Sequence, residues 1–113
     1  MIPILSENFV NVANVNDIPS SHMKEVQAVG EAICLINIEG KYYAIGNVCT
    51  HEGGPLAEGT LDGYEIECPW HGSKFDVRTG EVTSPPATEP ESTYEIKIDG
   101  NNILIKSSCN KPS

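Results

Sequence analysis

The chain contains two short segments in which a cysteine and a histidine stand close together: CTHEGGPL at residues 49–56 and CPWHGSKFDVRTGEV at residues 68–82. Each segment therefore offers one thiol and one imidazole on a loop that contains glycine and proline. A zinc finger groups its ligands differently, with two cysteines on one arm and two histidines on the other. If the two loops lie side by side, the thiolates can bind one metal ion and the imidazoles a second. This pairing suits a binuclear [2Fe–2S] cluster.

We therefore predict that Cys49, His51, Cys68 and His71 are the ligands of one [2Fe–2S] cluster, with the two cysteines on one iron and the two histidines on the other. Independent structural roles for these residues would require the whole pattern to be accidental. A mononuclear structural zinc site remains an alternative, but the pairing of one cysteine with one histidine on each loop disfavours it.

The remaining cysteines and the third histidine are interpreted as structural or surface residues. Cys34 lies in an apolar run and is predicted to be a small core residue. Cys109 lies in a polar tail and is predicted to be an exposed thiol, whereas His22 has no cysteine neighbour and is predicted to lie on the surface. A secreted disulfide scaffold would be denser in cysteine, so the context favours metal binding over disulfides.

The composition predicts one globular domain over residues 1–113, with a net charge of −9 from sixteen acidic and seven basic residues. Such a surface repels nucleic acids and anionic lipids, whereas it suits a basic protein partner. We find no basic stretch leading into an apolar run at the N-terminus, and no run near the roughly 18 apolar residues of a membrane helix. We therefore expect a cytoplasmic protein.

Short apolar runs that flank turn sequences predict an all-β fold. The expected hairpins join residues 32–38 with 41–45, 59–61 with 64–68, and 94–98 with 103–106. We also expect an edge strand at residues 9–12, one helical turn at most in residues 17–26, and an extended connector at residues 84–91. Together they predict a small antiparallel sandwich or barrel with one long excursion, at about residues 46–80, that holds the cluster.

The two cysteine–histidine segments resemble the cluster-binding boxes of Rieske iron–sulfur proteins. The C-x-H and C-x-x-H patterns match, and so do the sequences GKYYA at residues 40–44 and PPA at residues 85–87. The nearest resemblance is to the small Rieske-type ferredoxins of multicomponent oxygenases such as aromatic-ring dioxygenase systems. It implies a Rieske-type fold with an inserted cluster-binding subdomain and one cluster bound by two cysteines and two histidines.

Two departures separate this chain from the Rieske subunits of respiratory complexes. Those subunits carry an extra cysteine in each box, which form a disulfide, whereas this chain has Gly54 and Trp70 there. They also place a tyrosine hydroxyl near the cluster, where this chain has Phe75. Fewer hydrogen bonds to the cluster stabilise its reduced state less, so we expect a potential nearer about −150 mV than +300 mV.

The resemblance also implies the function. A Rieske cluster has four ligands on each iron and therefore no vacant position for a substrate, so we expect a one-electron carrier without catalytic residues. Its expected partners are a reductase as donor and an oxygenase or similar acceptor, with no small-molecule substrate. A non-catalytic Rieske-like small subunit of a larger reductase, such as nitrite reductase, remains the alternative.

Two surface features of the boxes allow more than one interpretation. Trp70 either shields the cluster or docks a partner, and shielding is favoured. Acidic residues outnumber basic ones between residues 49 and 76, and they form either a solvated face or an electrostatic docking surface. These charged residues are Glu52, Glu58, Asp62, Glu65, Glu67 and Asp76, against Lys74 alone.

Overall fold

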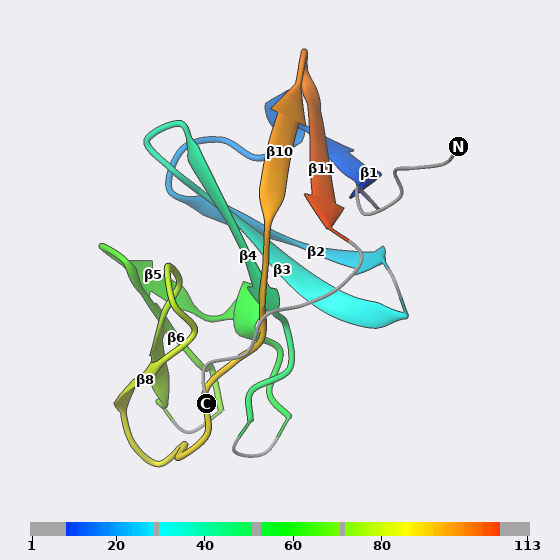
Figure 1. Ribbon diagram of the computed structural model, residues 1–113. Coiled ribbons are helices and arrows are strands. Elements are labelled where there is room, and N and C mark those ends of the chain that lie inside the picture. Colours follow the sequence, from blue (N-terminus) through cyan, green and yellow to red (C-terminus); the bar gives the residue numbers. More distant parts are fainter. Residues whose placement is uncertain (1–8, 29, 51–52, 71, 107–113) are drawn as a thin grey trace.

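The computed structural model describes residues 9–28, 30–50, 53–70 and 72–106, which form three antiparallel sheets (Figure 1). The first sheet has the order β1-β11-β10, the second β2-β3-β4-β9 and the third β5-β6-β7-β8. Two single turns of 3-10 helix, η1 and η2, interrupt the strands. The bounds are β1 (Phe9–Asn14), η1 (Val15–Asp17), β2 (His22–Ala28), β3 (Glu31–Ile38), β4 (Lys41–Gly46), η2 (Leu56–Glu58), β5 (Thr60–Asp62), β6 (Glu65–Glu67), β7 (Lys74–Asp76), β8 (Val82–Ser84), β9 (Thr93–Tyr94), β10 (Ile96–Asp99) and β11 (Asn102–Lys106).

The predicted all-β antiparallel fold is confirmed, and the turn conformation explains the hairpin of β3 and β4. Ile38 of β3 pairs with Lys41 of β4, so the connection consists of Glu39 and Gly40. Both have positive φ angles, 53° and 88°. Two successive left-handed residues make the tight turn whose twist matches that of a hairpin.

Strand β3 is the centre of the molecule, because both of its faces are buried. On one face Ile33 and Leu35 pack with Ile103 and Ile105 of β11, in a core that joins the first two sheets. On the other face Cys34 and Ile36 belong to a second core, which also includes Leu56, Ile66 and Phe75. A strand covered on both sides reads as a near-continuous apolar run, as AICLINI does.

The structure adds strands that the sequence analysis did not predict. The region in which one helical turn at most was expected contains most of β2, a seven-residue strand that pairs with β3 along its whole length. Strands β7 and β8 extend the predicted β5–β6 hairpin into a four-stranded sheet. Figure 1 shows this third sheet at the end of the molecule away from the β10–β11 turn.

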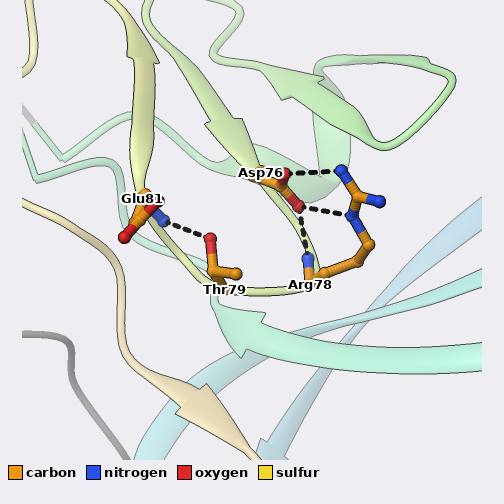
Figure 2. Close-up of polar contacts among 4 residues, drawn as sticks. All are labelled: Asp76, Arg78, Thr79 and Glu81. Atoms are coloured by element: carbon orange, nitrogen blue, oxygen red, sulfur yellow. Dashed lines mark hydrogen bonds and ion pairs between the residues drawn. The ribbon is translucent and has the colours of Figure 1, made fainter.

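Aromatic and charged side chains connect the third sheet to strand β4. The Asp76 carboxylate accepts hydrogen bonds from Arg78, from Nε at 3.1 Å and from Nη2 at 2.9 Å (Figure 2). The guanidinium carbon lies 4.2 Å from the centroid of the Tyr64 ring, which in turn meets Tyr43 of β4 edge-on at 6.2 Å. This chain of contacts links the third sheet to strand β4.

None of the helices described is long and apolar enough to cross a membrane.

Candidate metal centre

The first box forms a compact loop, residues 49–54, which follows β4 and precedes η2. The N–H of Cys49 donates to the carbonyl oxygen of Gly54 at 2.8 Å, and the N–H of Gly53 donates back to the carbonyl of Cys49 at 2.8 Å. This pair of bonds joins the two described ends of the loop to each other.

The second box forms a loop with the same backbone pattern, residues 68–73, between β6 and β7. The N–H of Cys68 donates to the carbonyl of Ser73 at 2.8 Å, and the N–H of Gly72 donates to the carbonyl of Cys68 at 3.2 Å. In both loops the cysteine therefore bonds to the residues four and five positions later, so the described ends of the two loops share one backbone hydrogen-bond pattern.

A glycine at the same position of each loop makes this structure possible. Gly53 and Gly72 each follow the cysteine by four residues, and both have a φ angle of +81°. Residues with a side chain are strained in this left-handed region, whereas glycine adopts it freely. The shared glycines are thus a backbone requirement of the two loops.

The two loops place both predicted cysteine ligands in the second core. The relative exposure of Cys49 is 2% and that of Cys68 is 3%, and neither is disulfide-bonded. The loops also touch: a β-carbon placed on Gly54 would lie only 2.7 Å from the Sγ atom of Cys68. His51 and His71 lie outside the described residues, so their assignment as ligands stays a prediction.

Residues 84–91 bring a third segment of chain against both loops. The N–H of Ala87 donates to Oγ of the buried Ser73 at 3.0 Å. The Thr50 hydroxyl donates to the carbonyl oxygen of Glu89 at 2.6 Å. The connector, which contains a cis Pro85–Pro86 bond, is therefore part of the site rather than a spacer.

Sequence reasoning missed Asn47 and Thr50, which hold the first loop in place. Asn47 is 2% exposed; its Oδ1 accepts a hydrogen bond from the N–H of Ala57 at 2.8 Å, and its carbonyl accepts one from Leu56 at 2.7 Å. Asparagine commonly satisfies backbone groups of a nearby turn, so its place just before the first box was a usable signal. Thr50 gave no comparable signal, because its partner Glu89 is far away in the sequence.

The other predicted non-ligands behave as expected where the structure describes them. Cys34 is fully buried, and burial raises the pKa of its thiol to about 12, with the charges of Glu25 and Glu91 adding to the effect. A thiol that stays protonated is a core residue rather than a metal ligand. His22 is exposed, with Nδ1 2.9 Å from the carbonyl oxygen of Ser20. Cys109 lies outside the described residues.

The described part of the site fits a [2Fe–2S] cluster. The buried thiols of Cys49 and Cys68, on adjoining loops, would supply the two thiolate ligands. Among the described residues, which exclude both candidate histidines, no three side chains of the metal-binding types come together. The described residues alone therefore do not form a complete metal site, such as one with cysteine ligands only.

Similarity to known proteins decides the family. The family model for the Rieske [2Fe–2S] domain matches residues 8–102. The chain belongs to this family. It is 37% identical to the ferredoxin component of the naphthalene 1,2-dioxygenase/salicylate 5-hydroxylase systems of a Ralstonia species. The alignment spans 102 residues, which are 90% of this chain and 98% of the relative.

Solved structures of Rieske ferredoxins have the same fold. The ferredoxin of carbazole 1,9a-dioxygenase from Nocardioides aromaticivorans IC177 superposes with a TM-score of 0.84 at 32% identity, over 88% of this chain and 97% of the other. A second match is to a chain in a structure described as the complex of reduced oxygenase and oxidized ferredoxin in carbazole 1,9a-dioxygenase. Its TM-score is 0.85 at 30% identity, over 95% of this chain and 98% of the other. The chain is thus a Rieske-type electron carrier with one [2Fe–2S] cluster.

Proposed function

We propose that this chain is a soluble cytoplasmic ferredoxin of a multicomponent oxygenase system, which takes one electron from a reductase and passes it to a terminal oxygenase. Its relatives at 30% identity or more include ferredoxin components of such systems, one of them solved with its oxygenase. They favour this role over that of a small subunit of nitrite reductase.

The pair of loops carries the proposal, because it brings two buried cysteines into one core. Cys49 and Cys68 would hold one iron, and His51 and His71 the other. When bound, the cluster accepts and releases one electron. The protein supplies the rest: the loops exclude water from the thiolates, and the connector at residues 84–91 holds the hydroxyl of Ser73 at the end of the second loop.

The ligand set is tested by the visible and EPR spectra of single variants. Cys49→Ala, His51→Ala, Cys68→Ala and His71→Ala should each abolish the spectrum of the Rieske cluster, because no other ligand can take the vacated position. Cys34→Ala is the control, since this residue is a buried thiol of the same core with a protonated side chain. Loss of the cluster in Cys34→Ala, or its retention in a ligand variant, would contradict the assignment.

The partner assignment is tested by stopped-flow mixing of the reduced protein with the oxidised terminal oxygenase of a naphthalene dioxygenase system. The visible spectrum should show reoxidation by one electron per ferredoxin. Mixing with the flavoprotein subunit of a nitrite reductase is the comparison. Electron exchange with that subunit alone, and none with the oxygenase, would contradict the proposed role.

A further inference from the structure

Trp70 lies between the two predicted ligands of the second loop, and 55% of its surface is exposed. Despite this exposure, the inner side of its ring contacts the first loop. A β-carbon placed on Gly54 would lie 3.0 Å from Cγ and 3.1 Å from Cδ2 of the indole. The same β-carbon would lie 2.7 Å from the Sγ atom of Cys68. The Gly54 backbone, the Cys68 thiol and the indole therefore meet at one point.

This contact joins two loops that are otherwise closed on themselves. The loop-closing backbone hydrogen bonds of Cys49 and of Cys68 each run within their own loop. Neither Cys49 nor Cys68 is disulfide-bonded, so no disulfide joins the described parts of the two loops. Packing of the indole on Gly54 is thus a direct link between the first loop and the second.

The position of the ring also decides which surface it covers. Its partly exposed outer side faces solvent, whereas its inner side lies over the backbone that borders the Cys68 sulfur. An aromatic ring buries a large apolar area at the cost of ordering only two torsions, so it is an efficient cover for a gap between loops. Gly54 is the matching half of the contact, because any side chain there would push the ring or the sulfur away.

We propose that Trp70 is a positioning residue that fastens the first loop to the second and covers the Sγ atom of Cys68 from water. It thereby lengthens the lifetime of the bound cluster and lowers its potential, because water near the cluster would stabilise the extra negative charge of the reduced state. This inference rests on the proposed function only in taking Cys68 as a ligand. It assigns Trp70 to holding the cluster rather than to recognising a partner.

The test compares cluster loss in the holoprotein and in three variants. Each protein is incubated in air with excess EDTA while the visible absorbance is followed, and its potential is measured by redox titration. Trp70→Ala should lose the cluster about tenfold faster than the wild type, which corresponds to a barrier lower by about 1.4 kcal/mol. Its potential should also be higher. Trp70→Phe, which keeps a flat ring on Gly54, should stay within a factor of about two or three of the wild type.

Val48→Ala is the matched control. Val48 is 53% exposed and stands beside Cys49, but its Cγ1 atom lies next to the first loop only, 3.7 Å from a β-carbon placed on Gly53. It should lose the cluster at the wild-type rate. If Trp70→Ala purifies without a cluster, Trp70→Leu is measured in its place, with faster loss again expected.

Loss of the cluster from Trp70→Ala at the wild-type rate would overturn the inference. If the same variant also transferred electrons to the oxygenase more slowly, Trp70 would be a docking residue instead. Failure of the proposed function looks different, since the wild type itself would then lack the EPR spectrum of a Rieske cluster.

Discussion

The N–H of Ala87 donates a hydrogen bond to the Oγ atom of Ser73 at 3.0 Å, and both residues are buried. A hydroxyl that accepts from this direction keeps its own proton for another acceptor. Ser73 closes the second loop, directly after Gly72, so its proton would be available to a cluster bound there. The connector at residues 84–91 therefore holds a potential hydrogen-bond donor at the end of the second loop.

Ser73→Ala should lower the potential, because the reduced cluster loses a hydrogen bond that stabilises its extra negative charge. It should also lower the free energy of unfolding by about 1–3 kcal/mol, since the buried N–H of Ala87 loses its acceptor. Redox titration and urea unfolding measure the two effects. Thr83→Ala, at an exposed position of β8, is the control and should change neither. An unchanged potential in Ser73→Ala would show that its hydroxyl does not face the cluster.

Glu67→Gln should raise the potential by tens of millivolts, because a fixed negative charge beside the cluster opposes reduction. The Oε2 atom of Glu67 lies 3.5 Å from a β-carbon placed on Gly72, so this carboxylate borders the second loop. Glu65→Gln is the matched control, since Glu65 is on the same face of β6 but pairs with Asp76, farther from the loop. Equal shifts in the two variants would mean that only net charge matters.

Arg78→Ala should lower the urea midpoint at pH 7, because it removes both hydrogen bonds to the Asp76 carboxylate and the contact with Tyr64 (Figure 2). The hydrogen bond from Arg78 holds the pKa of Asp76 below its usual value. This contribution is therefore complete above the unfolded-state pKa and is lost as the pH falls through the folded one. The difference between wild type and Arg78→Ala should shrink below about pH 4.

Lys106→Ala serves as the control for this stability experiment. The Nζ atom of Lys106 lies 3.7 Å from Oε1 of Glu95, and this ion pair is exposed to solvent. Removing it should change the free energy of unfolding by no more than about 0.5 kcal/mol. A difference between wild type and Arg78→Ala that does not depend on pH would show that the contact with Tyr64, rather than the ion pair, carries the effect.

Electron transfer to the oxygenase should slow as ionic strength rises, because the third sheet presents a row of carboxylates. Asp62 of β5 and Glu65 of β6 stand directly opposite each other, and Asp76 of β7, which is paired with Arg78, continues the row. Attraction to a basic partner surface is screened over about 8–10 Å at physiological salt. The double variant Asp62→Asn/Glu65→Gln should therefore have a lower second-order rate at low salt and a weaker salt dependence. If the second-order rate changes with neither salt nor these substitutions, the row of carboxylates is only a solvated face.

The sequence predicted the parts of the fold that local chemistry determines. Glu39-Gly40 marked its hairpin because Gly40 readily adopts the left-handed conformation of a tight turn, and the apolar run of β3 marked a buried strand. Strand β2 was missed because its side chains are mostly exposed or half-buried, so it depends on pairing with β3 rather than on its own pattern. The three-residue strands β7 and β8 are too short to show a period.

The same distinction applies to the site. The spacing of cysteines and histidines predicted the ligand set, because ligands must stand at fixed places in a short loop. The contacts of Thr50 with Glu89 and of Trp70 with Gly54 join segments that only the folded chain brings together. No local pattern could reveal them.

The nitrogen ligands are tested most directly by ENDOR spectroscopy of the reduced protein labelled with ¹⁵N-histidine. The chain has three histidines, and His22→Gln removes the exposed one, leaving His51 and His71. Both the wild type and His22→Gln should show two strongly coupled ¹⁵N nuclei, with the low average g value of a cluster that has two histidine ligands on one iron. A single coupled nitrogen, or none, would contradict the proposed metal centre.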